Sequence, residues 1–146
     1  MALRLSTGLR NGMCGSLGIK EMLDGGNIKI YSGTQPSSAD HAETVGSVLL
    51  ALITSSSGTD GVRLGTQGAG AIPKAASVWS GTVLASGVAG WFRYYGTAGT
   101  TGTSATEIRL DGNTGVSGAD MTLANSSLVA GATLTIDTFT LTQPAS

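Results

Sequence analysis

His41 is the only histidine of the chain, and it lies among acidic and hydroxyl residues in a polar segment. In a hydrolase it would act as a general base, oriented by Asp40 and assisted by Ser37 or Ser38. Residues that adjoin one another in a loop do not by themselves supply the geometry of a triad, so we expect a solvated loop histidine. The sequence therefore predicts no enzyme and no catalytic residues.

Metal and cofactor sites are also not indicated by the residues present. Cys14 is the only cysteine, so the chain lacks a second cysteine or histidine that would complete a zinc site. Two acidic turns, at 58–61 and 110–115, resemble calcium loops only loosely, because they lack ligands at alternating positions and a terminal glutamate. The glycine cluster at 65–70 fits no phosphate-binding pattern. We expect no metal, no cofactor and no small-molecule substrate.

Aromatic side chains gather in the middle of the chain, and they allow two interpretations. Trp79, Trp91 and Tyr95, with Tyr94 beside them, would suit a sugar-stacking platform in a carbohydrate-binding module. Rings of this kind also pack ordinary cores and interfaces with one polar end satisfied. We favour core plus interface, and we expect Arg93 to cover an aromatic face at the surface or at an interface.

The composition is unusual in its lack of charge. Charged residues are 12% of the 146 residues, against about 25% in typical domains, and glycine is abundant. Either much of the surface is hidden against copies of the chain or other proteins, or a compact β domain contains many glycine turns. The net charge of −1 and the scattered basic residues give no support to nucleic-acid binding.

Membrane insertion and secretion are not indicated either. The apolar run over residues 48–53 is too short to cross a bilayer, and the first residues lack the apolar core of a signal peptide. We expect a protein that is made in the cytoplasm and stays soluble, or that leaves its cell by lysis rather than by secretion.

Residues 6–24 have an apolar stripe at helical spacing, with Ser6 or Thr7 as the N-cap. Their glycines predict a break into two helices near Gly15 or Gly18. A strand over 28–31, a polar loop to 42 and a second strand within 43–54, buried on both faces, are expected next. Residues 55–75 are expected to form a long connection, the weakest ordered part of the chain, with a possible short strand at 62–64.

The second half of the chain predicts several short strands. Strand material is expected over 78–89, and residues 90–96 form a strand with Trp91, Arg93 and Tyr95 on one face and Phe92 and Tyr94 on the other. A strand over 106–111 precedes a turn at 111–113. In the last strand, 132–142, the apolar residues change from even positions, Leu134 and Ile136, to odd positions, Phe139 and Leu141. One extra residue would return all four to the same face, which predicts a β-bulge near residues 137–138.

These elements predict a mainly β fold, an antiparallel β-sandwich of jelly-roll type with an N-terminal helical segment. We expect one compact unit in which a helical arm, residues 1–26, packs on a sandwich domain, residues 27–146.

The chain contains the segments LSTGLRN at 5–11, IKIYSGTQPSSAD at 28–40, WSGT at 79–82, GVAGWFR at 87–93 and SGAD at 117–120. Together these segments resemble small virion structural proteins of tailed bacteriophages. The resemblance covers most of the chain and implies a component of the virion, in capsid decoration or in the neck, collar or tail. It transfers no catalytic residues.

From this resemblance and the low charge we expect a non-enzymatic structural protein that forms a homo-oligomer and binds other phage virion proteins. Nucleic acid, membrane and small molecules are not expected partners. The alternative is a carbohydrate-binding β-sandwich module of a host-contact appendage. The candidate interface residues are Leu5, Leu9, Met13, Gln35, Pro36, Trp79, Trp91, Arg93 and Tyr95.

Overall fold

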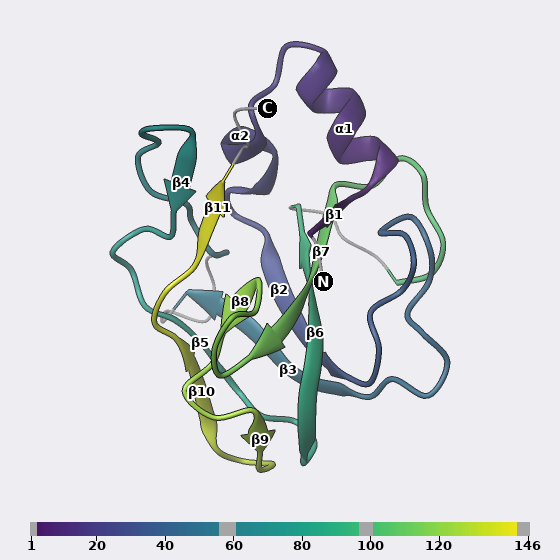
Figure 1. Cartoon of the computed structure of the whole chain (residues 1–146), viewed down its shortest axis with the longest axis vertical. Coiled ribbons are helices and arrows are strands. Elements are labelled where there is room, and N and C mark those ends of the chain that lie inside the picture. Colours follow the sequence, from purple (N-terminus) through teal and green to yellow (C-terminus); the bar gives the residue numbers. More distant parts are fainter. Residues whose placement is uncertain (1–2, 56–60, 97–100, 143–146) are drawn as a thin grey trace.

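A computed structural model describes residues 3–55, 61–96 and 101–142 of the chain (Figure 1). The fold is mainly β, with antiparallel sheets and two short helices near the amino terminus, and it is compatible with a β-sandwich, so the predicted fold class is confirmed. The elements, in chain order, are β1 (Arg4–Leu5), α1 (Thr7–Cys14), α2 (Ile19–Leu23), β2 (Asn27–Ser32), β3 (Leu49–Ser55), β4 (Ala71–Pro73), β5 (Trp79–Thr82), β6 (Gly87–Tyr95), β7 (Arg109–Gly115), β8 (Met121–Thr122), β9 (Ser127–Leu128), β10 (Thr133–Ile136) and β11 (Thr140–Thr142).

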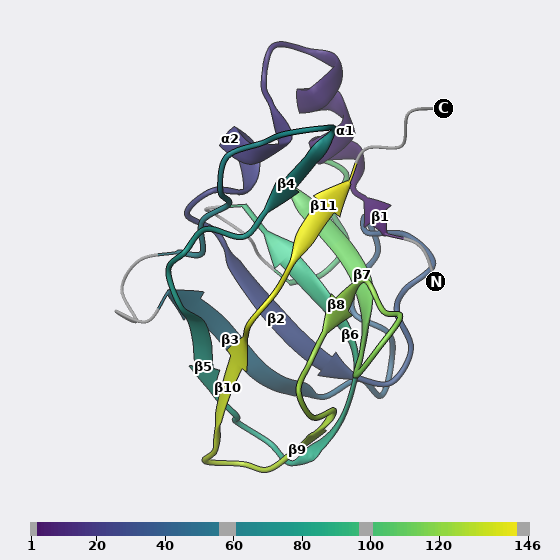
Figure 2. The same cartoon turned by 60° about the vertical axis from the view of Figure 1, so that its left-hand side comes forward.

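The strands form one large sheet and one small one. The large sheet has the order β1-β7-β6-β2-β3-β5-β10, while β8 pairs with β7 and β9 pairs with β6. All of these pairs are antiparallel except β7 with β8. The small sheet consists of β11 and β4, which lie in front of β2 and β6 in Figure 2. The core lies between these layers.

Alternation along the central strands separates two faces of the large sheet. On β6, Phe92 and Tyr94 lie opposite Ile30 and Ile28 of β2, and all four side chains are buried in the core. Phe139, which precedes β11, contacts the rings of Phe92 and Tyr94 and so joins the second layer to the first. The predicted division of residues 91–95 between two faces is confirmed.

The helical segment begins and breaks as the glycines and caps predict. The Ser6 hydroxyl accepts a hydrogen bond from the backbone N–H of Leu9, which makes Ser6 the N-cap of α1. The helix ends at Cys14, and Gly15 and Gly18 lie in the break before α2. Ser6 also donates to the carbonyl of Glu107 and accepts from the N–H of Arg109, so α1 is fixed to β7.

The amino-terminal arm contains a short strand in addition to its two helices. Residues 4–5 form β1 and pair with β7, so the arm contributes a strand to the sheet as well as helices. Neither α1 nor α2, the helices within the described part of the chain, is long and apolar enough to cross a membrane.

Two local predictions are wrong. The strand expected within 43–54 begins only at Leu49, after a loop in which Val45 is fully exposed, and it is not buried on both faces, because Leu52 is 37% exposed. The turn expected at 111–113 is instead part of β7, where Asp111 pairs with Arg93 and Gly112 lies opposite Phe92. A Cβ on Gly112 would lie 2.6 Å from the Phe92 ring, so the glycine provides room for a buried ring rather than a turn.

The last strand is interrupted at residues 137–139, close to the predicted position. Leu134, Ile136, Phe139 and Leu141 are all buried, as the parity argument required. The mechanism differs from the predicted bulge, because the chain leaves β5 after Ile136 and pairs with β4 from Thr140 onward. A strand that changes sheets at a bend achieves the same change of phase.

The connection between β3 and β5 is partly packed against the core. Val62 and Leu64 are buried, and each forms an isolated bridge, Val62 with Gly26 and Leu64 with Lys74, rather than the short strand that was considered. Residues 56–60, which include part of one acidic turn, lie outside the described residues.

Candidate functional site

The side chains with the most chemical potential lie on the face of β2, β6 and β7 that points away from the core. We call them the polar cluster: Tyr31, Glu43, Trp91, Arg93, Tyr95, Arg109 and Asp111. Alternation places Trp91, Arg93 and Tyr95 on this face of β6, opposite Tyr31 of β2 and Asp111 of β7. Glu43 comes from the loop of residues 33–48, which covers the cluster and is called the covering loop below.

Arg93 and Asp111 form the centre of the polar cluster. The Nε and Nη2 atoms of Arg93 lie 2.7 and 2.8 Å from the two carboxylate oxygens of Asp111, and both side chains are fully buried. Burial alone would lower the pKa of Arg93, but the Asp111 carboxylate raises it above its ordinary value. Burial raises the pKa of Asp111, and the two bonds from Arg93 oppose that effect. The two bonds give each buried group a compensating partner.

Glu43 joins the covering loop to this centre. Its Oε1 atom accepts hydrogen bonds from the hydroxyls of Tyr95, at 3.1 Å, and Tyr31, at 3.4 Å, and lies 3.7 Å from Nη1 of Arg93. Burial acts to raise the pKa of Glu43, but its backbone contacts, the Tyr95 hydroxyl and the charge of Arg93 lower it overall. Burial raises the pKa of both tyrosines, so they remain neutral donors.

Arg109 fixes the covering loop at a second point. Its Nη1 donates to the carbonyl of Gly102 at 2.7 Å and, over longer distances, to the carbonyls of Ala39 and His41. Its other nitrogens bond to the carboxylate of Glu107. A charged group that bonds mainly to backbone carbonyls of loops stabilises their conformation.

The aromatic residues are packed and have no accessible ring face. Tyr31 and Trp91 stack with centroids 4.5 Å apart, and the Trp91 Nε1 donates to Ser47 of the covering loop. Trp79 lies on the other side of the sheet, in the core against Tyr94 and Phe139. Trp79, Trp91 and Tyr95 are each 0% exposed, so they form no common platform on which a sugar could stack.

The candidate interface residues lie mostly inside the chain. Leu9, Trp79, Trp91, Arg93 and Tyr95 are fully buried, and Gln35 and Pro36 are buried beneath the covering loop's surface. Only Leu5 and Met13 are partly exposed, where they line a groove along α1 with Thr7, Arg10, Asn11 and Cys14. Side chains that the fold itself buries offer no contact area to a partner. An interface of this chain would therefore have to use other, exposed residues.

The residues considered for catalysis lie in the covering loop, whereas Cys14, considered for metal binding, is the last residue of α1. His41 is exposed, and its Nδ1 lies 3.2 Å from the Ser37 hydroxyl. The carboxylate of Asp40 binds the backbone N–H and the hydroxyl of Thr7 instead of orienting His41. Cys14 is exposed and has a free thiol. No group of three or more metal-ligating side chains occurs within residues 3–55, 61–96 and 101–142.

Sequence reasoning missed most of the polar cluster. It identified the face of β6 that carries Trp91, Arg93 and Tyr95, but it did not pair Arg93 with Asp111 or bring Glu43 to Tyr95. The sequence did contain one signal for this pair. Arg93 lies in a strand of large apolar and aromatic residues, and an arginine that is buried there requires an acidic partner on a neighbouring strand.

The fold and the polar cluster define a mainly β, antiparallel protein whose buried charges hold loops to a sheet. Comparison with protein-family models, with curated proteins and with solved structures found no match for this chain.

Proposed function

We propose that this chain is a non-enzymatic structural protein of a tailed-bacteriophage particle that self-assembles and binds other virion proteins. Capsid decoration and a neck, collar or tail position are the proposed placements, and the proposed location is the virion, after synthesis in the host cytoplasm. The proposal combines the sequence resemblance described above with one surface feature of the structure.

That feature is one end of the molecule, whose segments contain no charged side chain. The proposal rests on it. Residues 75–92 and 121–136 contain no charged side chain, and they form β5, most of β6, β8, β9 and β10. We call this region the uncharged end. It lies opposite α1 and α2, around β9 in Figure 1.

Large apolar side chains are exposed at the uncharged end. Leu84, Val88 and Val129 are 58%, 62% and 65% exposed. Their turns are joined, since the N–H of Ala130 donates to the Ser86 hydroxyl and the N–H of Gly131 donates to the carbonyl of Val83. An apolar surface without charges favours association with another protein, because burying it requires no desolvation of ions.

The polar cluster supports a structural role in a different way. It uses its charges and hydroxyls to bind the covering loop to the sheet, and it removes Arg93, Arg109 and Asp111 from the molecular surface. A protein that occurs in many copies in a particle benefits from such a rigid unit, because flexible loops lose entropy in each contact that they form.

The first test is whether the protein is present in the particle. Peptide mass spectrometry of gradient-purified virions, with cryo-electron microscopy to place the density, should find the chain at a fixed copy number. Its absence from intact virions, together with a strictly monomeric purified protein, would overturn the proposal.

A second test examines the surface that carries the proposal. Replacement of Leu84, Val88 and Val129 by serine should lower the self-association observed by mass photometry. The matched control replaces Leu17, Val45 and Val116, which are exposed to a similar or greater extent outside the uncharged end, and it should leave self-association unchanged. Equal effects of the two triple variants would contradict the proposal.

A further inference from the structure

We infer that two copies of this chain pair through the free edges of their β10 strands, antiparallel, around a two-fold axis at Leu134. The inference rests on the self-assembly in the proposed function and deepens it by naming the surface and its partner, a second copy of the chain.

One edge of β10 has no partner in the described part of the chain. β10 is the last strand in the order of the large sheet, and its register pairs only with β5. Residues along such an edge present unpaired N–H and C=O groups, which bind another strand readily. This edge has neither proline nor lysine, the residues that usually prevent such pairing.

A bulge at the start of β10 shows which residues face the free edge. The N–H of Gly131, whose φ is +90°, donates to the carbonyl of Val83, and the N–H of Val83 donates to the carbonyl of Ala132. Bonded pairs alternate along an antiparallel ladder, so Leu134 and Ile136 direct their backbone groups toward β5. Thr133 and Thr135 therefore direct their backbone N–H and C=O groups to the free edge.

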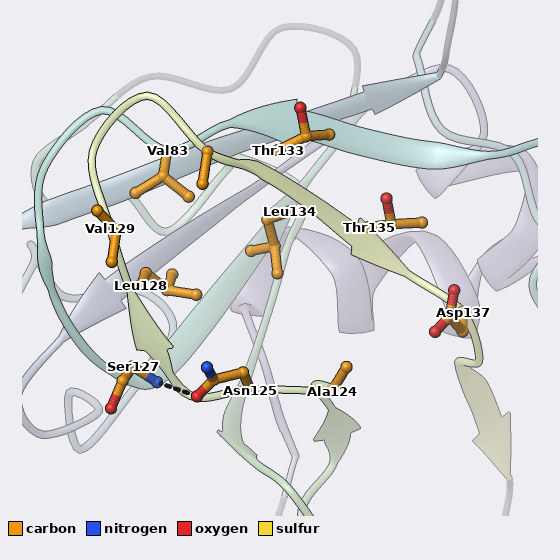
Figure 3. A pocket seen from close by; sticks show the side chains of 11 residues that line it. Val83, Ala124, Asn125, Ser127, Leu128, Val129, Thr133, Leu134, Thr135 and Asp137 are labelled. Atoms are coloured by element: carbon orange, nitrogen blue, oxygen red, sulfur yellow. Dashed lines mark hydrogen bonds between the residues drawn. The ribbon is translucent and has the colours of Figure 1, made fainter.

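A groove with both apolar and polar lining, Asp137 included, lies beside this edge. It has a volume of about 350 Å³, and Val83, Leu128, Val129 and Leu134 contribute its apolar lining. Figure 3 shows Leu134 pointing into the space between β10 and the segment with Ala124 and Asn125, whereas Thr133 and Thr135 point the other way. A strand that pairs with the edge of β10 would extend one wall of this groove and cover its apolar residues.

The backbone pattern of β10 is complementary to itself. With a two-fold axis at Leu134, Thr133 lies opposite Thr135 of the second copy, and Thr135 lies opposite its Thr133. Both of these pairs have their N–H and C=O groups directed at each other, as hydrogen-bonded pairs require. The two Leu134 residues then form the close, non-hydrogen-bonded pair, with Cα atoms about 4.5 Å apart and side chains beside the two grooves.

Charge favours a second copy over other partners. A two-fold axis brings like residues together, so a charge near it would meet a like charge, and the uncharged end has none. The nearest charge is Asp137, and in this register the two Asp137 residues lie at opposite ends of the pair, about 20 Å apart at 3.3 Å per residue. That separation exceeds the screening length of about 8 Å at physiological salt. An acidic peptide would find no opposite charge here, and a basic peptide would find only Asp137, which lines the groove.

The first experiment removes only the outward hydrogen-bond donor. Thr135→Pro deletes the N–H that faces the free edge and leaves the bonds of Leu134 and Ile136 to β5 intact. In sedimentation-velocity experiments we expect the dissociation constant of the dimer to rise at least about tenfold, since one bond is lost in each copy. Thr135→Ala retains the N–H and is the matched control, with affinity within about threefold of wild type.

The second experiment tests the axis directly and covers the case in which the proline variant does not fold. In a Cys14→Ser background, Leu134→Cys places the two thiols on the axis, within the Cα separation that a disulfide allows. Mild oxidation should give a disulfide-linked dimer in high yield. Ser117→Cys, on an exposed turn outside the uncharged end, measures cross-linking by random collision and should give little.

The outcomes separate this inference from the proposed function. If the wild-type protein associates but Thr135→Pro has no effect and Leu134→Cys cross-links no better than Ser117→Cys, the β10 pairing is wrong and self-assembly uses another surface. If the variants behave as expected but purified virions lack the protein, the pairing stands and the particle assignment fails. A strictly monomeric wild-type chain overturns the pairing.

Discussion

Arg93 and Asp111 lie directly opposite each other on β6 and β7 and are joined by two short hydrogen bonds, and neither side chain is accessible to solvent. Their positions fix the register of the two strands, because a slip of β7 by one residue would place the Asp111 carboxylate on the apolar face of the sheet, away from Arg93. A pair of this kind adds little stability over apolar residues of similar size, but it is costly to break.

Breaking the pair should therefore cost more than removing it. Arg93→Met leaves the Asp111 carboxylate buried without its partner, and we expect a loss of about 3–5 kcal/mol in the free energy of unfolding. The double variant Arg93→Met/Asp111→Leu should recover most of that loss. Urea unfolding measures both, and Arg10→Met, which removes an exposed guanidinium, should change stability by less than about 0.5 kcal/mol. A double variant as unstable as the single one would contradict this account.

Two adjacent tyrosines should respond in opposite ways to the loss of a hydroxyl. The Tyr94 hydroxyl is buried in the core without a hydrogen-bond partner in the described structure, so Tyr94→Phe should raise stability by about 1 kcal/mol. The Tyr95 hydroxyl donates to Glu43, so Tyr95→Phe should lower stability by about 1 kcal/mol. Thermal unfolding of the two variants, each the other's control, tests the assignment of the two faces of β6, and equal shifts would refute it.

The elements that were predicted correctly have short-range signals. Ser6 and the glycines after Cys14 determine where α1 begins and ends, and the alternation of residues 91–95 divides them between two faces whatever strand lies beside them. Local hydrogen bonds and period-2 geometry are sufficient for such predictions.

The errors come from long-range pairing. Asp111, Gly112 and Asn113 have the composition of a turn, but Arg93 and the Phe92 ring on the neighbouring strand stabilise them as a strand. The change of sheet between Ile136 and Thr140 likewise depends on where β4 and β5 lie, which parity alone does not indicate. The polar cluster was recognised only in part for the same reason, since Glu43 reaches Tyr95 through a loop without regular structure.

The close approach at Gly112 gives a prediction that compares two glycines. In Gly112→Ala the new Cβ would lie 2.6 Å from a Phe92 ring carbon and 2.8 Å from a Leu3 methyl carbon, so we expect a loss of about 1–3 kcal/mol. Gly68 has open space around its Cβ position and no positive φ, so Gly68→Ala should be neutral or stabilising by up to about 1 kcal/mol. Chemical denaturation of both variants provides the comparison, and a neutral Gly112→Ala would show that the sheet accommodates a side chain there.

The covering loop should weaken in acid, because two of its carboxylates bind the rest of the chain. Burial acts to raise the pKa of Glu43 and of Asp40, but the bonds to Glu43 described above and the bonds from Thr7 to Asp40 lower both pKa values overall. A pKa that is lower in the folded state stabilises the fold above the unfolded values, near 4.5 and 3.8, and this contribution is lost as the pH falls through the folded values.

The stability that Glu43 and Asp40 contribute, measured from pH 7 to pH 3, should therefore decline below pH 4.5, whereas the raised pKa of Asp111 acts in the opposite direction. Glu43→Gln should be less stable than wild type at pH 7, and the difference between the two proteins should shrink as the pH falls, because wild-type Glu43 becomes neutral as well. Glu21→Gln removes a carboxylate outside the covering loop and serves as the control. A difference between Glu43→Gln and wild type that stays constant over the whole range would mean that the charge of Glu43 does not hold the loop, and that its side chain acts there only as a neutral acceptor.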